Sequence, residues 1–333
     1  MLTQKPAMTT MSTELGALSV RVAAKHAEAT DICSFELVAT DGHALPAFTA
    51  GSHVDVQIRE GLVRQYSLAN NPSERHRYVL GVLREAASRG GSMAMHDTVS
   101  VGDVLRISSP KNHFALHPDA RRSLLFAGGV GVTPILSMAE HLHDAGADFA
   151  MHYCSRSPSR TAFLARIKSS PLASRVQVHH DDGPDMHKLD LASALGPVSG
   201  GTHIYVCGPG GFMDVVLAGA RAAGWPPLQL HAEFFSGQAQ DDSGNAPFDV
   251  KLASSGRVIT IPADKSIVQT LAEAGIDIPT SCEQGVCGTC LTRVIAGQPD
   301  HRDAYLTAEE RDRNDQLLPC CSRARSPQLV LDL

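Results

Sequence analysis

Four cysteines have the residue type and the spacing of a metal centre. They are Cys282, Cys287, Cys290 and Cys320, in the pattern C-x4-C-x2-C-x29-C. This is the spacing of a plant-type [2Fe–2S] site, in which three thiolates come from one loop and the fourth from a distant segment. Gly285 and Gly288 allow the loop to turn and to aim backbone N–H groups at the sulfurs. The pattern predicts one-electron chemistry.

Other uses of these cysteines remain open at this point. A zinc ribbon usually shows two separated C-x2-C knuckles, whereas this chain has one run of three cysteines and a single distant one. A disulfide set is less favoured, because no signal peptide is recognisable at the N-terminus. Cys321 follows Cys320 directly, and two adjacent residues cannot both point at the same cluster. The residues alone do not decide between these two thiols.

Composition excludes some classes of function. A chain of 333 residues allows two or three domains. The net charge of −6 and the lack of a basic stripe argue against a nucleic-acid partner. No apolar run approaches the roughly 20 residues that span a bilayer. Eight cysteines without a secretory signal predict a cytoplasmic protein. The sixteen histidines are scattered, and we do not expect them to bind metal.

Three kinds of element must position the predicted cluster and its electron source. Short alternating runs separated by turn residues fill the first 110 residues or so and predict a small antiparallel barrel. From about Arg121, strands alternate with helices, which indicates a doubly wound parallel sheet. A polar stretch from Gly237 to Pro247 reads as a linker. We therefore expect a disordered tail (1–13), a barrel domain (14–117), a parallel-sheet domain (118–235), a linker (236–247) and a domain that holds the cysteines (248–333).

Two short motifs in the barrel suit a flavin. Arg64-Gln-Tyr66-Ser67 places an aromatic ring beside hydroxyl and cationic groups. Arg84 to Ser92 includes Arg89 and adjacent glycines, whose N–H groups can hold a phosphate. A tyrosine on a strand is usually a core residue, and the second motif alone could be a surface turn. Together they favour a flavin phosphate site.

Two glycine-rich turns follow strands of the predicted parallel sheet. Gly128 to Pro134 leads from a strand into a helix, and Cys207 to Met213 follows a later strand. Such turns lie at the carboxyl ends of parallel strands, where doubly wound sheets bind ligands. The first turn lacks the G-x-G-x-x-G pattern. Cys207 is either a buried thiol at a strand end or a thiol beside the nicotinamide.

With these motifs, the chain resembles the phthalate dioxygenase reductase family. Members of this family are fused flavin, NAD and ferredoxin reductases that serve Rieske oxygenases. The similarity to vanillate demethylase reductases is equally close, and it covers residues 14–333. The matching segments are Arg64-Gln-Tyr-Ser-Leu68, Ser88-Arg-Gly-Gly-Ser92, Ala127 to Met138, Cys207-Gly-Pro209, His231-Ala-Glu-Phe-Phe235 and the segment that begins at Cys320. The last match is the reason to assign Cys320 rather than Cys321 as the fourth ligand.

The resemblance implies a multidomain fold: a six-stranded antiparallel β-barrel for flavin, an α/β doubly wound parallel sheet for NAD, and an α+β β-grasp [2Fe–2S] ferredoxin domain. It implies FMN rather than FAD, and NADH rather than NADPH. Arg156 and Ser157 follow the second strand without an acidic residue and could accept a 2′-phosphate, which leaves NADPH open. From the motifs and the resemblance we expect cofactor contacts from Arg64, Tyr66, Ser67, Leu68, Val82, Arg84, Arg89, Gly90, Gly91, Ser92, Gly128, Gly129, Val130, Gly131, Thr133, Pro134, Arg156, Ser157, Cys207, Gly208, Pro209 and Phe235.

The implied function is electron transfer from NADH through flavin and the cluster to a terminal Rieske oxygenase. A hydride carries two electrons, whereas an iron–sulfur acceptor takes one, and a flavin reconciles the two. Ser67, Cys207 and Phe235 are expected to align the hydride path. A cytochrome P450 or a diiron oxygenase as acceptor, and a redox sensor that transfers no electrons, are the alternatives. The chain is expected to be monomeric. From Phe248 onward, 12 acidic and 9 basic residues suit either docking to a basic partner or an ordinary solvated surface.

Overall fold

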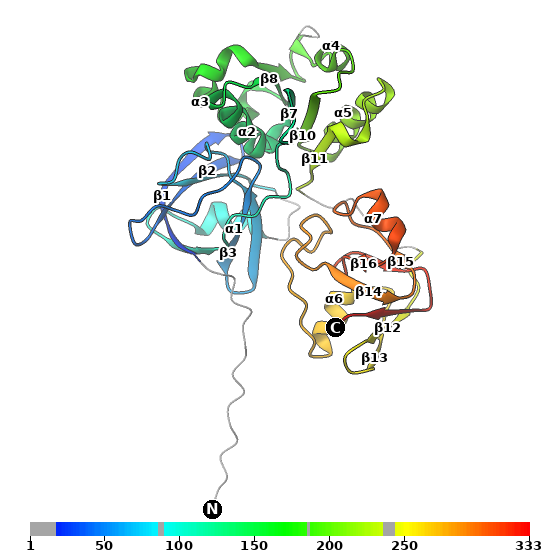
Figure 1. Cartoon of the computed structure of the whole chain (residues 1–333). Coiled ribbons are helices and arrows are strands. Elements are labelled where there is room, and N and C mark those ends of the chain that lie inside the picture. The colour runs from blue at the N-terminus through cyan, green and yellow to red at the C-terminus, as the bar shows by residue number, and fades with distance from the viewer. Residues whose placement is uncertain (1–17, 86–89, 185–186, 236–243) are drawn as a thin grey trace, which may run out of the picture.

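Three main sheets, each with its own buried core, build the chain (Figure 1). The computed structural model describes residues 18–85, 90–184, 187–235 and 244–333. The predicted tail (1–13), Arg89 and residues 236–243 of the predicted linker lie outside these ranges. Within the described ranges, no helix combines the length and the apolar character that crossing a bilayer requires.

The first sheet is the expected six-stranded antiparallel barrel. Its strands are β1 (Leu18–Ala29), β2 (Ile32–Ala39), β3 (His53–Arg59), β4 (Leu62–Ser67), β5 (Tyr78–Leu83) and β6 (Val104–Ile107), and α1 (Gly91–Thr98) lies between β5 and β6. The strand order is β4-β3-β6-β1-β2-β5. A bridge between Leu68 and Leu80 joins the two edges and closes the barrel. Alternate residues such as Val20, Val22 and Leu37 point inward and form the core.

The second sheet is parallel and carries helices on both faces. Its strands are β7 (Arg122–Gly128), β8 (Asp148–Ser155), β9 (Val176–His180), β10 (Thr202–Cys207) and β11 (Leu230–Glu233), in the order β11-β10-β7-β8-β9. The helices are α2 (Val132–Asp144), α3 (Leu164–Ser169), α4 (Leu191–Leu195) and α5 (Gly210–Ala222), with short 3-10 turns η1 (Gly129–Gly131), η2 (Pro158–Arg160), η3 (Pro171–Arg175) and η5 (Pro227–Gln229). Leu125 packs on the α2 face, whereas its neighbours Leu124 and Phe126 pack on the α5 face. Side chains on both faces of β7 are therefore buried, which explains why its sequence is a continuous apolar run.

The third sheet is mixed and holds the cysteines at one end. Its strands are β12 (Phe248–Leu252), β13 (Val258–Ile261), β14 (Thr292–Ala296), β16 (Gln316–Leu317) and β18 (Gln328–Leu331), in the order β13-β12-β18-β14-β16. A separate pair joins β15 (Pro299–Asp300) to β17 (Arg323–Ala324), and the helices are α6 (Ile267–Glu273) and α7 (Ala308–Arg313). Ile267 and Leu271 of α6 pack into the core of this sheet. Together with the parallel sheet and the barrel, this unit confirms the predicted fold class.

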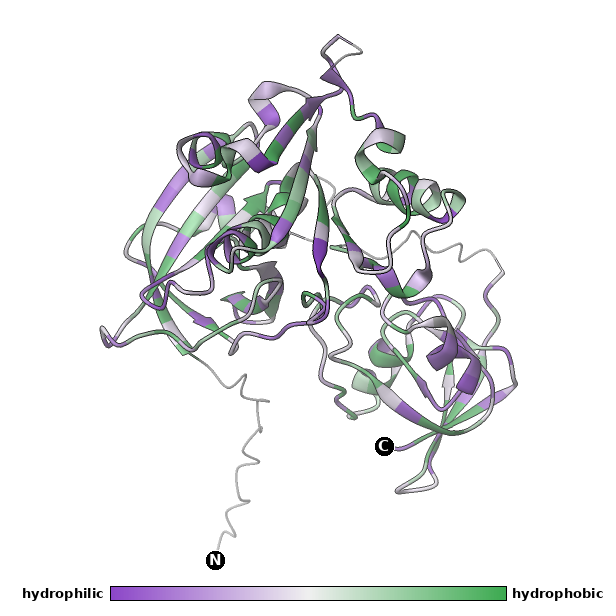
Figure 2. Ribbon diagram, turned by 45° about the horizontal axis from the view of Figure 1, so that its top comes forward, coloured by the Kyte–Doolittle hydropathy of each residue, from purple (hydrophilic) through white to green (hydrophobic). Residues whose placement is uncertain are grey.

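Hydropathy follows these layers. Hydrophobic and hydrophilic residues alternate along the strands, and α7 is largely hydrophilic (Figure 2). In Figure 1, the third unit lies beside the barrel and below the parallel sheet, so that the segment between α6 and β14 faces the barrel. That segment contains three of the four predicted cluster cysteines. The arrangement therefore brings the predicted flavin, NAD and cluster motifs to one place.

Candidate functional site

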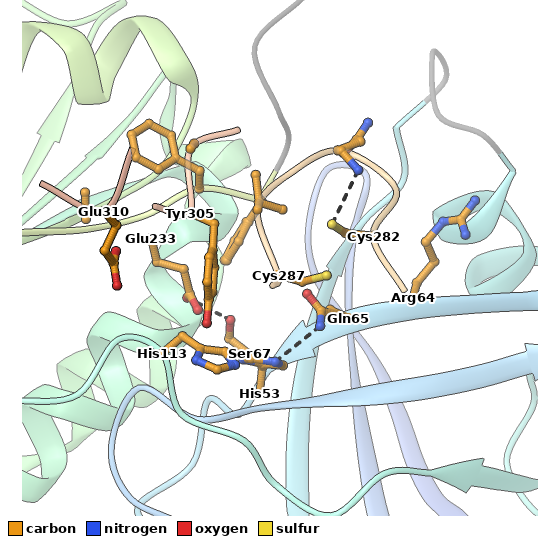
Figure 3. A pocket seen from close by; sticks show the side chains of 16 residues that line it. His53, Arg64, Gln65, Ser67, His113, Glu233, Cys282, Cys287, Tyr305 and Glu310 are labelled. Atoms are coloured by element: carbon orange, nitrogen blue, oxygen red, sulfur yellow. Dashed lines mark hydrogen bonds between the residues drawn. The ribbon is translucent and has the colours of Figure 1, made fainter. Parts of the chain in front are cut away.

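A cavity of about 350 Å³ lies where the three units meet (Figure 3). The barrel, the end of the parallel sheet and the cysteine-bearing segment each supply part of its wall. The lining residues are His53, Arg64, Gln65, Ser67, His113, Ala232, Glu233, Phe234, Phe235, Cys282, Gln284, Val286, Cys287, Ala304, Tyr305 and Glu310. The predicted residues Arg64, Ser67, Phe235, Cys282 and Cys287 are therefore gathered around one space.

Strand β4 presents the predicted flavin motif. Pairing with β3 fixes its register, with Tyr66 opposite Val54 and Arg64 opposite Val56. The hydroxyl of Tyr66 is buried and has no hydrogen-bond partner among the described residues. Burial also raises the pKa of this phenol, so that it remains a neutral donor. A buried donor without a partner fits a cofactor that carries hydroxyl or phosphate oxygens.

The predicted phosphate loop leads directly into α1. Gly90, the N-cap of this helix, has a φ of 83°, which favours glycine. A Cβ atom on Gly91 would meet the side chain of Arg64, so glycine lets the start of the helix lie close against this side chain. The hydroxyl of Ser92 accepts a hydrogen bond from the backbone N–H of Glu85 at 3.1 Å. A helix N-terminus beside an arginine fits a phosphate group.

Four of the expected flavin contacts differ from the rest in accessibility, in their partners or in lying outside the described residues. Leu68 and Val82 are buried in the barrel core, so only their backbone atoms can face a cofactor. Arg84 forms an ion pair with Asp97 of α1 at 3.0 Å, which directs its guanidinium along the barrel surface. Arg89 is not among the described residues. These contacts remain predictions.

The two glycine-rich turns of the parallel sheet pack against each other. β7 and β10 are neighbours, with Ala127 opposite Cys207. A Cβ atom on Gly131 would meet the backbone carbonyl of Cys207, and one on Gly208 would meet the backbone of Gly128. The glycines are therefore needed for this close approach. Both turns lie at the carboxyl edge of the sheet, where doubly wound folds bind ligands.

Other predicted nucleotide contacts lie around this edge. Thr133 is buried in the first turn of α2 and donates a hydrogen bond to the carbonyl of Val130 at 3.0 Å. Pro134 is also buried in that turn. Arg156 and Ser157 follow β8, the neighbour of β7, and Arg156 is exposed. The predicted nucleotide residues are thus at one sheet edge, although their side chains differ in accessibility.

Ser67, Cys207 and Glu233, which we call the carboxylate site, meet at the end of the parallel sheet. Ser67 donates a hydrogen bond to Oε2 of Glu233 at 3.1 Å, as Figure 3 shows. Burial raises the pKa of Glu233 to about 8, and the bond from Ser67 opposes this only in part. Cys207 is opposite Glu233 on the adjacent strand, and burial and this carboxyl raise the pKa of its thiol. At neutral pH the site holds a protonated carboxyl and a neutral thiol.

Glu233 was not among the predicted site residues, although the segment His231–Phe235 contains it. Phe235, the predicted aromatic of that segment, is 40% exposed at the rim of the cavity. A neutral carboxyl can hold or release a proton near pH 8, and the neutral thiol is a poor nucleophile. The arrangement therefore suits positioning and proton exchange rather than covalent catalysis.

Residues 281–290, which we call the cysteine loop, present buried thiols. Gly285 and Gly288 have φ angles of 71° and 72°, as the predicted turns require. The backbone N–H of Gln284 donates to the sulfur of Cys282, and that of Thr289 donates to the sulfur of Cys287, each at 3.4 Å. Such N–H donors stabilise thiolate ligands.

The four predicted ligands form two pairs of contacting thiols. Cys282 contacts Cys287, and Cys290 contacts Cys320. The hydrogen bond within the first pair lowers the pKa of Cys287. No three His, Cys, Asp or Glu residues in the described ranges surround a point that would hold a single metal ion. Four thiols gathered in two neighbouring pairs are the donor set that a [2Fe–2S] cluster requires.

Cys321 lies beside the cysteine loop rather than apart from it. A Cβ atom on Gly285 would meet its sulfur, and the thiol donates to the carbonyl of Leu318 at 3.7 Å. It also contacts the side chain of Cys320. The prediction that Cys321 is a packed thiol and Cys320 the ligand agrees with these contacts but is not decided by them.

Comparison with protein families gives two matches. Residues 250–325 match the 2Fe-2S iron-sulfur cluster binding domain. Residues 106–230 match the N-terminal domain of the dimethylamine monooxygenase subunit DmmA-like family. The first match contains all four predicted cluster ligands.

Full-length relatives extend the similarity to the whole chain. A vanillate O-demethylase oxidoreductase of Pseudomonas putida is 53% identical over 313 residues, which cover 94% of this chain and 98% of the relative. A solved phthalate dioxygenase reductase, described as a modular structure for electron transfer from pyridine nucleotides to [2Fe–2S], is 40% identical with a TM-score of 0.74, over 96% of this chain and 98% of the other. An intact type IV self-sufficient cytochrome P450 monooxygenase is 37% identical with a TM-score of 0.85, over 99% of this chain but 43% of the other.

Proposed function

Because the chain belongs to the family of oxygenase reductases that includes phthalate dioxygenase reductase and vanillate O-demethylase oxidoreductase, we propose that it supplies electrons from NADH to a Rieske-type oxygenase. It is an NADH-dependent flavin and iron–sulfur oxidoreductase. The acceptor is an aromatic-ring dioxygenase or an O-demethylase. We also propose that the protein is a monomer and that it acts in the cytoplasm, where its thiols stay reduced.

One observation carries this proposal: residues of the flavin motif, the carboxylate site and the cysteine loop line one cavity. Bound FMN would supply hydride acceptance from NADH and one-electron release, and a bound [2Fe–2S] cluster would supply one-electron transfer to the acceptor. The unpartnered Tyr66 hydroxyl and the approach of Gly91 to Arg64 support FMN binding at β4 and the start of α1. The two thiol pairs support cluster binding by Cys282, Cys287, Cys290 and Cys320.

The protein's own residues mainly bind and orient. Arg64 and the N–H groups at the start of α1 hold the FMN phosphate. The paired glycine turns at Gly128–Gly131 and Cys207–Pro209 hold the NADH pyrophosphate and direct the nicotinamide toward the cavity. The hydrogen bond from Ser67 to Glu233 holds a protonated carboxyl in the wall of that cavity. Phe235 at the rim excludes water from the reacting faces.

The predicted domain bounds, 14–117, 118–235 and 248–333, are part of this proposal. The limits of the three sheets support these bounds, because β6 ends at Ile107, β11 ends at Glu233 and β12 begins at Phe248. NADH is proposed rather than NADPH on family grounds. Arg156, which is exposed after β8, is the residue to test for a contact with a 2′-phosphate.

A cytochrome P450 is the second candidate acceptor. The match to 43% of a self-sufficient P450 monooxygenase favours it, because almost the whole of this chain is covered by that region. Reduction kinetics with a purified Rieske oxygenase and with a P450 would separate the two. Preference for the P450 would contradict the Rieske assignment.

The first experiment is an anaerobic titration of the purified protein with NADH, followed in the visible spectrum. We expect flavin and iron–sulfur absorbance that are both bleached, and FMN as the flavin released on denaturation. NADPH serves as the matched donor control and should be at least tenfold less effective. A colourless or zinc-loaded protein would overturn the proposal.

A further inference from the structure

A buried contact joins the cysteine loop to the barrel. Ser281 immediately precedes Cys282, and its hydroxyl donates a hydrogen bond to Oδ1 of Asp55 at 2.8 Å. Asp55 belongs to β3 and is 3% exposed, and Ser281 is 7% exposed. The two residues are 226 positions apart in the sequence. The contact therefore depends on how the ferredoxin unit lies against the barrel.

The barrel holds Asp55 rigidly in place. Its other oxygen, Oδ2, accepts a hydrogen bond from Nζ of Lys111 at 2.7 Å. Lys111 is itself bridged to β3 through two backbone hydrogen bonds with His53. The backbone of Asp55 is bonded to Ser108 through both its N–H and its carbonyl. Residues of the barrel alone therefore hold the Asp55 carboxylate that accepts the hydrogen bond from Ser281.

The charge of Asp55 suits this role. Burial raises the pKa of this carboxyl, but hydrogen bonds from Lys111, Ser281 and Gln65 and the charge of Lys111 outweigh burial, and the net pKa is lowered. A buried carboxylate that loses one of its donors is costly, because its oxygen then has to find water. The barrel supplies the lysine, and the ferredoxin unit supplies the serine.

A second contact joins the same two units at the wall of the cavity. The ring of Tyr305 meets His113 edge-on, with ring centres 5.6 Å apart, and His113 lies 5.5 Å from His53. Tyr305 also covers Gly288, where any Cβ atom would meet its ring. Figure 3 shows Tyr305 and His113 beside each other in the cavity wall. The cysteine loop is therefore held at both of its ends.

We propose that Asp55 and Ser281 are positioning residues that dock the cysteine loop on the flavin barrel and set the gap that electrons cross. This inference rests on the proposed function and adds to it the residues that fix the docked arrangement. Among the described residues, a hydrogen bond to a charged acceptor and an edge-on ring contact join the two units here. Contacts of this strength fix how the cysteine loop lies against the barrel, and they can still be broken when the loop separates from it.

Ser281→Ala is the central test, because it removes only the donor. Ser281→Thr keeps the hydroxyl, and Ser255→Ala alters an exposed serine of the same unit as a matched control. Asp55→Asn tests the same contact from the barrel side. Hydrogen exchange measured by mass spectrometry reports docking directly. We expect exchange over residues 279–289 to be about tenfold faster in Ser281→Ala, and unchanged in Ser281→Thr and Ser255→Ala.

Anaerobic stopped-flow spectroscopy gives the functional readout. After mixing with NADH, flavin bleaching should keep its rate in Ser281→Ala, whereas the transfer to the cluster should slow by about tenfold. Unchanged exchange and unchanged transfer in both Ser281→Ala and Asp55→Asn would overturn the proposal. Exchange does not require electron flow, so a protein that NADH cannot reduce would count against the proposed function and leave the docking result readable.

Discussion

The cysteine loop and the carboxylate site lie at one cavity but are assembled in opposite ways. Three of the four proposed cluster ligands come from nine consecutive residues. Ser67 and Glu233 are 166 positions apart, and Cys207 joins them from a third strand. A cluster must be wrapped closely, so its ligands are local in sequence. Alignment of the flavin and nicotinamide rings requires contacts from several directions, so the residues that provide them are far apart in the sequence. The predictions below test whether the two regions also function separately.

The largest effect is expected from the cysteine loop. Cys290→Ser removes one ligand, and reduction of cytochrome c should fall to background because the path beyond the flavin is lost. NADH-driven flavin bleaching should persist, since the carboxylate site is untouched. Cys321→Ser is the control and should keep its cluster absorbance. Equal loss of both activities in Cys290→Ser would show that the regions do not function separately.

A large effect confined to the other region is expected from Gly131→Ala. The new Cβ atom would meet the carbonyl of Cys207 and push the two glycine turns apart. We expect kcat/KM for NADH to fall about ten- to hundredfold, because small misplacements strongly reduce transfer rates. Flavin and iron content should stay the same. Gly200→Ala, where a Cβ atom meets nothing, is the matched control.

A smaller, pH-dependent effect is expected from Glu233→Gln. The folded pKa of Glu233 is raised from 4.5 to about 8, so the unfolded chain loses this proton first. The resulting stability is present at low pH and is lost as the pH rises from about 4.5 to about 8, by at most roughly 5 kcal/mol. Thermal unfolding between pH 5 and 9 should therefore show a steeper decline for the wild type than for Glu233→Gln. Identical slopes would mean that Glu233 is ionised throughout.

The smallest effect is expected from Ser92→Ala at the start of α1. Loss of the hydroxyl removes its bond to the Glu85 N–H and one donor to the proposed phosphate. The dissociation constant of FMN, measured by fluorescence titration, should rise about three- to tenfold. Ser73→Ala, an exposed serine of the barrel, should leave it unchanged. No change in Ser92→Ala would place the phosphate elsewhere.

The sequence predicted best those features that depend on neighbouring residues. The cysteine spacing indicated the iron–sulfur domain, and the alternating runs indicated the barrel and the parallel sheet. The glycine turns were recognised because close backbone approach excludes a Cβ atom, as Gly131 and Gly208 show. In each case the physical requirement acts over a few residues and leaves a local pattern.

Features that depend on tertiary contact left no such pattern. Glu233 stands within a recognised segment, but its burial against Ser67 becomes visible only in the folded chain. Asp55 and Ser281 look like ordinary strand and loop residues until the third unit is placed beside the barrel. The ion pair of Arg84, an expected cofactor contact, with Asp97 likewise depends on how α1 packs beside β5. Sequence shows which groups are available, whereas packing decides which of them meet.

The position of β18 in its sheet has a consequence for how the protein is made. This strand, Gln328–Leu331, lies between β12 and β14 and pairs with both. The barrel and the parallel sheet have all their strands by Glu233, and they can fold while the ribosome is still translating. The third sheet lacks its middle strand until Leu331 has left the exit tunnel. The sheet that carries the cysteine loop can therefore be completed only after the barrel and the parallel sheet have all their strands.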